Sequence, residues 1–244
     1  MSISMELVLQ YVFSVPFAKG AAMTLLLTVC ALACGVVIGL VVALAQDAKS
    51  GALRGATVGY LWLFRGTPVL FQIIFIFNVL PAFGITLTAF TSAVLALSLN
   101  EGAYMAEVVR SGLLAVKKGQ RTAGLSLGMR DWEVQRYVVI PQALRVILPP
   151  LGNQMIGMLK LSALVSVIAV EELLLVANQT ASANFKYFEA LTAAGIYYLG
   201  MTTIFMAIQW LLERAVNPKL RRRTAPVSIT SRLLRSTAAG SLTR

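Results

Sequence analysis

Two ionisable side chains, Glu101 and Lys160, lie inside segments that are otherwise apolar enough to cross a membrane. A charge at the bilayer centre costs about 2.5–3.5 kcal/mol on insertion scales, so both groups should face the protein interior, where they can pair. Asn100, Tyr104 and Ser162 are polar residues of the same two segments. Together the five residues predict either a structural polar cluster or the lining of a polar pathway.

Three further charged residues flank this region. Glu107 and Arg110 are three positions apart, a spacing that brings side chains together on one helix face and predicts a structural ion pair. Arg65 precedes Gly66 and Pro68, which predict a break in the second apolar segment. The Arg65 side chain either extends to the lipid headgroups or helps to position the long polar loop after the third segment.

The residues needed for catalysis are missing from this sequence. It contains no histidine and no recognisable pairing of a nucleophile with a base. It also lacks the Gly-x-x-x-x-Gly-Lys-Ser/Thr loop with which many ATPases hold phosphate. We therefore expect no enzyme activity, no metal site and no cofactor on this chain.

The composition predicts an all-α, polytopic membrane protein in a single domain. Of the 244 residues, 58% are hydrophobic and 13% are charged, whereas soluble domains have roughly 45–50% apolar and about 25% charged residues. About 20 apolar residues cross a bilayer, and about five such spans are expected within residues 24–212. Their expected ranges are 24–45, 58–80, 85–106, 151–170 and 190–212.

Segments at each end of the chain are expected to differ from the spans. Residues 1–20 mix apolar and polar types, which is typical of an amphipathic helix at the outer membrane surface. The first apolar run is too long for a signal peptide, so we expect it to be retained. Residues 221–244 are basic and rich in Ser, Thr and Ala, and are expected to be disordered.

One face of the first span is built from small residues at intervals of four. A face of this kind allows two membrane helices to pack closely. It consists of Ala31, Gly35, Gly39 and Ala43.

The charges predict the orientation of the chain. With the N-terminus outside and five spans, only Lys19 and Lys186 of the 21 lysines and arginines lie outside. The reverse orientation would violate the positive-inside rule. We therefore expect a cytoplasmic C-terminus, and this membrane topology explains the net charge of +11 without nucleic acid.

The polar loop at residues 110–150 then lies in the cytoplasm between spans three and four. A loop of this length usually carries function. Its sequence predicts a short helix over residues 120–127, a stop at Gly128, and a second helix that begins at Asp131 and ends before Pro141.

The polar loop also carries an apolar stripe at helical spacing. The stripe consists of Leu125, Met129 and Trp132. Such a ridge either enters a groove of a partner protein or packs back on the second helix of the loop or on the membrane surface. The residues alone leave these alternatives open.

Several fragments, taken in order and spacing, resemble the polar amino-acid branch of the bacterial ABC-transporter permeases. They are Phe64–Pro68, Ala103–Gly112, Gly119–Gln120, Leu127–Gly128, Val138–Ala143, Leu148–Asn153, Leu159–Lys160 and Ser166–Ile168. The coupling motif of that family begins Glu-Ala-Ala, for which this chain has Thr122, Ala123 and Gly124. The motif continues with a glycine, here Gly128, and ends in a hydrophobic residue and proline, here Ile140–Pro141.

The resemblance implies a coupling helix that contacts a separate ATPase subunit. The residues to which it assigns this coupling are Gly119, Thr122, Ala123, Leu125, Gly128, Met129 and Trp132. Because the family's glutamate is Thr122 here, a polar contact made by that glutamate is not expected in this chain.

The resemblance further implies a permease subunit of an ATP-driven importer for a polar amino acid or a derivative such as an opine. Two permeases, identical or paralogous, would form the pathway in the bacterial inner membrane. ATP would be bound by the partner ATPases, and an external binding protein would deliver the substrate. Asn100, Glu101, Tyr104, Lys160 and Ser162 would then meet the ammonium and carboxylate of the substrate.

Span four departs from the family at Leu161, where members commonly carry aspartate after the lysine. This disfavours a system that needs the aspartate to bind arginine or lysine. The alternative function is an ion-coupled secondary transporter or channel, in which Glu101 and Lys160 carry the coupling. Internal repeats are common in that class, and none is recognisable in this sequence.

Overall fold

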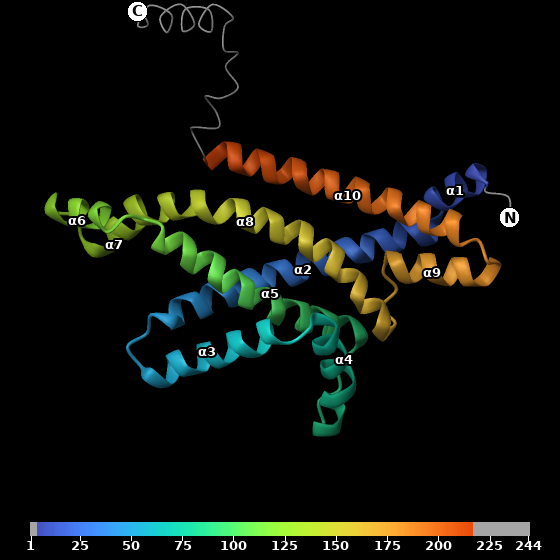
Figure 1. The fold of residues 1–244 in the computed structure, drawn as a ribbon, viewed down its shortest axis with the longest axis horizontal. Coiled ribbons are helices and arrows are strands. Elements are labelled where there is room, and N and C mark those ends of the chain that lie inside the picture. Colours follow the sequence, from blue (N-terminus) through green and yellow to red (C-terminus); the bar gives the residue numbers. More distant parts are fainter. Residues whose placement is uncertain (1–3, 217–244) are drawn as a thin grey trace, which may run out of the picture.

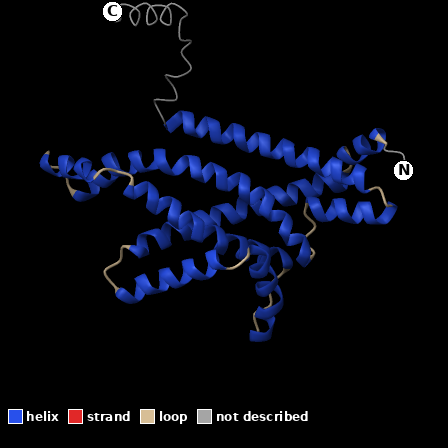
Figure 2. Cartoon of the chain, viewed as in Figure 1, coloured by secondary structure: helices blue, strands red, loops and turns tan. Residues whose placement is uncertain are grey.

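The computed structural model describes residues 4–216, and within them the chain forms helices and no strand (Figure 2). The elements are α1 (Met5–Val12), α2 (Val15–Gln46), α3 (Gly51–Gly66), α4 (Val69–Val79), η1 (Leu80–Phe83), α5 (Ala89–Leu114), α6 (Lys118–Ser126), α7 (Asp131–Glu133), η2 (Val134–Val139), α8 (Ile140–Leu161), η3 (Ser162–Ile168), α9 (Leu173–Asn184) and α10 (Tyr187–Val216). The expected tail at residues 221–244 lies outside the described residues.

The long helices run along the length of the molecule (Figure 1). α6 and α7 lie at one end of it, α1 and α9 lie at the other, and α4 points sideways out of the bundle. The long helices therefore connect the two ends of the molecule, as the helices of a protein that crosses a bilayer do.

The centre of the bundle is the contact between α2 and α5. The predicted small-residue face of α2 makes this contact: Ala31, Gly35, Gly39 and Ala43 are all buried. A Cβ atom at Gly35 would lie 2.7 Å from Cγ of Glu101, and one at Gly39 would lie 2.9 Å from the backbone nitrogen of Ala106. The two backbones approach so closely because these positions have no or small side chains.

Three helical stretches are long and apolar enough to span a membrane: α2, the stretch from Asp131 to Ile168, and α10. The pair α3 and α4–η1 makes a fourth if it is counted as one bent span. α5 has 26 residues and is long enough to span a membrane. It is not among the stretches that are also apolar enough, and it contains the polar residues Asn100 and Glu101. The count of five spans therefore stays a prediction, with α5 as the fifth candidate.

The predicted break in the second apolar segment is confirmed. α3 ends at Gly66, α4 begins at Val69, and their axes differ by 105°. Thr67 and Pro68 between them are extended, which agrees with the preference of proline and of the residue that precedes it.

The polar loop folds into a platform, by which we mean α6, α7 and η2. The predicted stop is confirmed, because Gly128 has a φ of 81° and so adopts the left-handed conformation that favours glycine. The predicted end of the second helix before Pro141 is wrong. The helical stretch that begins at Asp131 continues to Ile168, and Pro141 is accommodated directly after the π-helical η2, where the regular hydrogen-bond pattern of an α-helix is already interrupted.

Candidate transport pathway and coupling surface

The side chain of Asn100 forms hydrogen bonds on both sides of the break between α3 and α4. Its side-chain amide donates a hydrogen bond of 3.0 Å to the carbonyl of Phe64 and another of 3.1 Å to the side-chain oxygen of Gln72. Gln72 in turn donates to the same carbonyl at 3.0 Å and to that of Thr67 at 3.1 Å. Because exposed backbone groups are costly inside a bilayer, Asn100, which is buried in this chain, is placed to stabilise the break.

The predicted pair of Glu101 and Lys160 does not form. Glu101 is 2% exposed, packs against Gly35 of α2, and its Oε1 atom has no hydrogen-bond partner among the described residues. Lys160 is instead exposed on α8. The prediction failed because similar depth in two spans does not bring two side chains to the same side of the bundle.

The remaining two predicted pathway residues, Ser162 and Tyr104, differ in their exposure. Ser162 is fully buried, and its hydroxyl donates at 2.8 Å to the carbonyl of Leu159 in the preceding turn. Tyr104 is 38% exposed on α5. Of the five predicted residues, only Tyr104 and Lys160 are therefore accessible in this chain.

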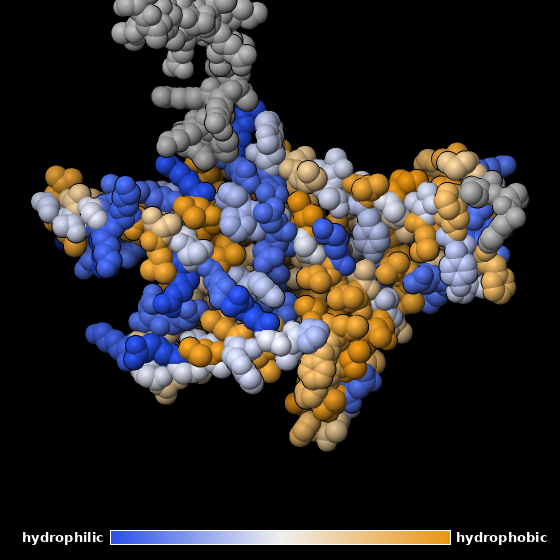
Figure 3. Space-filling view, in the orientation of Figure 1, coloured by the Kyte–Doolittle hydropathy of each residue, from blue (hydrophilic) through white to orange (hydrophobic). Residues whose placement is uncertain are grey.

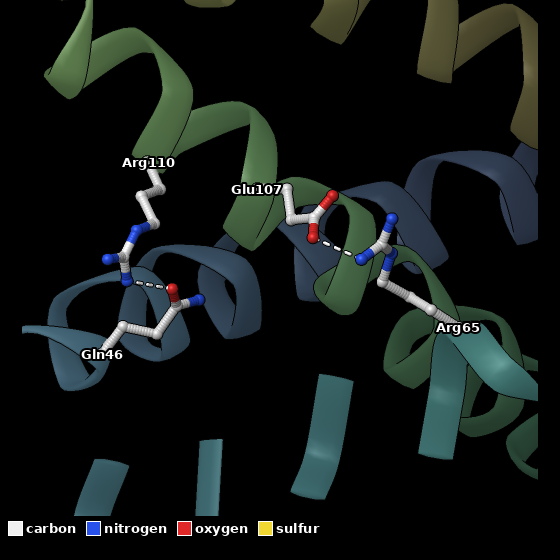
Figure 4. A network of polar contacts seen from close by, with 4 residues as sticks. All are labelled: Gln46, Arg65, Glu107 and Arg110. Atoms are coloured by element: carbon white, nitrogen blue, oxygen red, sulfur yellow. Dashed lines mark hydrogen bonds and ion pairs between the residues drawn. The ribbon is translucent and has the colours of Figure 1, made fainter. Parts of the chain in front are cut away.

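Glu107 and Arg110 do not pair with each other, which corrects the prediction from their spacing (Figure 4). Glu107 forms an ion pair with Arg65 at the end of α3. Arg110 contacts the side-chain oxygen of Gln46 and lies 3.7 Å from the Asp47 carboxylate, both at the end of α2. Each side chain pairs with the neighbouring helix on its own side of α5, so the two contacts join α5 to α2 and to α3.

An open groove of about 510 Å³ lies between α3 and α5 beside the Arg65–Glu107 pair. Its lining residues are Val58, Leu61, Trp62, Arg65, Gly66, Tyr104 and Glu107. The Arg65 guanidinium also lies 5.7 Å from the centre of the Tyr104 ring, within the range of a cation–π contact. Sequence reasoning placed Arg65 next to a helix break but did not find its partner, and no motif indicated Trp62.

The apolar stripe of the platform remains largely open to its surroundings. Leu125 and Trp132 are 43% and 55% exposed, and the neighbouring Leu127 is 84% exposed. Only Met129 is half-buried. The stripe as a whole therefore does not pack back on the second helix of the loop.

Gly124 explains how the two helices of the platform fit together. It is buried, and a Cβ atom there would lie 2.9 Å from a methyl group of Val134 in η2. An ion pair of 3.0 Å between Arg121 and Asp131 joins α6 to α7, which directly precedes η2. Glycine in place of the family's second alanine therefore allows close contact between α6 and η2.

The other residues that the coupling motif assigns to this surface are accessible. Gly119, Thr122 and Ala123 are exposed on α6. The Thr122 hydroxyl donates at 3.3 Å to the carbonyl of Lys118 within the helix, so it is already hydrogen-bonded.

These features define a helical membrane subunit with an exposed platform. The chain belongs to the family of inner membrane components of binding-protein-dependent transport systems, whose family model matches residues 35–218. Proteins of this family are permease subunits and not enzymes, as the sequence predicted.

Individual relatives are also named as permeases of transport systems. The glutamine transport system permease of Escherichia coli (strain K12) is 42% identical over 157 residues, covering 64% of this chain and 72% of the relative. The L-cystine transport system permease of Bacillus subtilis (strain 168) is 38% identical over 175 residues, covering 71% and 74%.

Solved structures agree with the fold. The crystal structure of an amino acid ABC transporter with histidines matches with a TM-score of 0.81 and 40% identity, covering 88% of this chain and all of that one. An inward-facing methionine ABC transporter matches with a TM-score of 0.70 at 18% identity, over 82% of this chain and 96% of that one. The second likeness shows the fold alone.

Proposed function

We propose that this chain is the membrane-spanning subunit of an ATP-driven importer for a polar amino acid or an amino-acid derivative. The relatives that are named for glutamine and L-cystine transport support this substrate class. A second permease, identical or paralogous, would complete the pathway, and an external binding protein would deliver the substrate. α5 would serve as the fifth span, with the N-terminus outside and the C-terminus in the cytoplasm.

The observation that carries the proposal is the exposed apolar ridge of the platform. Leu125, Leu127 and Trp132 expose their side chains at the tip of the molecule, where the charge distribution predicts cytoplasm. The chain has no phosphate loop of its own. A separate ATPase subunit that binds this ridge would supply the ATP hydrolysis and move the platform as it closes.

Lys160 is the strongest candidate for the pathway among the residues predicted from sequence. It is exposed on α8, within a segment apolar enough to span the membrane. Lipid contact would be costly for its ammonium group. This favours a place against the second permease or in a water-filled passage, where Lys160 can meet the carboxylate of a substrate.

Reconstitution tests the proposal directly. The chain is placed in liposomes with and without its ATPase and external binding protein, and uptake of the twenty standard L-amino acids and of representative opines is measured. We expect uptake only when ATP and both partners are present. Uptake by the chain alone under a proton or sodium gradient would instead identify an ion-coupled transporter and refute the proposal.

A further inference from the structure

The groove between α3 and α5 opens beside a polar stripe of α5. From Tyr104 to Ser111, the exposed residues of this helix are Tyr104, Glu107 and Ser111, whereas Met105 and Ala106 are buried. A helix face that contacts lipid has the opposite pattern, with apolar residues outside. The stripe therefore faces water or another protein.

The surface around the groove agrees with this orientation. In Figure 3 hydrophilic residues gather over the half of the visible face that carries α3 and the platform, while hydrophobic residues cover α4. The groove lies along α3 and α5 and reaches Gly66 at the end of α3, beside the break that leads into α4.

The two charges of the groove remain accessible although they contact each other. The side chains of Arg65 and Glu107 are 40% and 46% exposed. Trp62 beside them is 77% exposed and Val58 is 64% exposed, so an apolar wall adjoins the pair. The groove has a volume of about 510 Å³ and is largely open to its surroundings, so a bound molecule would contact the chain on one side only.

We propose that this groove is a binding station for the α-ammonium and α-carboxylate groups of the transported amino acid. The guanidinium of Arg65 binds the carboxylate, for which its planar donors are suited. The carboxylate of Glu107 binds the ammonium, and Trp62 and Val58 contact the apolar part of the substrate side chain. The inference rests on the proposed function and assigns to it a site on α3 and α5, away from Lys160.

Charge balance favours a zwitterion as the ligand. The Arg65–Glu107 pair is neutral overall, and when it opens around a zwitterion one ion pair is replaced by two, so no net charge is added to the groove. A simple anion or cation would leave one of the two protein charges to water alone, which costs little at 40% and 46% exposure, so the preference for a zwitterion comes from the second ion pair that it gains. The headgroup of phosphatidylethanolamine carries the same paired charges, so the test must separate it from an amino acid.

Trp62 provides a local reporter. The chain has three tryptophans, so the wild-type assembly is compared with an assembly that carries Trp62→Phe, and the difference in fluorescence reports on the groove. Both are assembled with the ATPase in nanodiscs of phosphatidylglycerol and titrated with the amino acid that the wild-type assembly takes up in the uptake screen. We expect a saturable change in Trp62 fluorescence. The α-amide and the des-amino analogue of that amino acid should bind at least tenfold more weakly.

Substitutions separate a binding station from a structural clamp. Arg65→Lys and Glu107→Gln should each raise the apparent Kd at least tenfold, while Arg54→Lys, at an exposed position of the same helix, should not change it. The double variant Arg65→Glu/Glu107→Arg restores an attractive pair between α3 and α5 with the charges exchanged. We expect the exchange to leave affinity and uptake impaired.

Three results would overturn the station. The first is wild-type uptake with no Trp62 response, and the second is full recovery of uptake in the charge-exchanged variant. The third is a Trp62 response to phosphatidylethanolamine nanodiscs but not to the amino acid. These results leave the importer function intact, whereas failure of the wild-type assembly to take up any amino acid or opine refutes the proposed function together with the station.

Discussion

Replacement of Gly39 by alanine tests whether the α2–α5 contact holds the bundle together. The added methyl group would lie 2.9 Å from the backbone nitrogen of Ala106 and closer still to Met105. A backbone atom cannot rotate away, so the two helices must separate, and the gap affects the small-residue face on both sides.

The size of the effect follows from two opposing contributions. Overpacking a close contact costs about 1–3 kcal/mol, and a clash with backbone lies near the upper end. Alanine in a helix gains about 0.8–1.0 kcal/mol over glycine. The expected net loss is about 2 kcal/mol in the free energy of unfolding, which lowers the ratio of folded to unfolded protein by roughly thirtyfold.

Gly59→Ala is the matched control. Gly59 lies in α3 and has no atom within 4 Å of the position of an added Cβ, so this variant should gain stability by up to about 1 kcal/mol. Both variants are unfolded by titration with sodium dodecyl sulfate while circular dichroism follows the helix content. If the free energies of unfolding of Gly39→Ala and Gly59→Ala agree within about 0.5 kcal/mol, the close contact described for α2 and α5 is wrong.

Three further substitutions test the apolar ridge, the helix break and Lys160. Leu125→Ala combined with Trp132→Ala should prevent the ATPase from co-purifying with this chain. Because both side chains are exposed, the free energy of unfolding should change by less than about 1 kcal/mol. Retained co-purification would refute the ridge as the binding site of the ATPase. Asn100→Leu should destabilise the fold by about 1–3 kcal/mol in the same titration, because it removes two hydrogen bonds at the break between α3 and α4, and an unchanged midpoint would contradict this role. Lys160→Met should abolish uptake in liposomes with the ATPase still bound, and normal uptake would remove Lys160 from the pathway.

Features that depend on local sequence could be predicted. Gly66 and Pro68 produce the break between α3 and α4 through their own backbone preferences, and Gly128 adopts a conformation that disfavours other residues. The small-residue face of α2 repeats at the helical period, so its packing role is visible in the sequence. These predictions needed no knowledge of which helices are neighbours.

Features that depend on the arrangement of helices could not be predicted in the same way. Glu107 pairs with Arg65, which is 42 residues away in the sequence, although Arg110 is close by on the same helix. Position along a span predicts the depth of a side chain but not the direction in which it points, and for that reason Glu101 and Lys160 seemed to be partners. The motif around Arg65 was a usable signal, since an arginine beside a helix break needs a partner inside the membrane.

The continuous helix that starts in the platform has a mechanical consequence. Asp131–Ile168 contains 38 residues, which at about 1.5 Å per residue corresponds to a length of roughly 57 Å. No loop separates its exposed tip from its membrane portion, so a displacement of the tip is carried into the membrane along the helix. The regular hydrogen bonds of the helix are interrupted at η2 and at Pro149 and Pro150 inside α8, and these are the places where it would bend first.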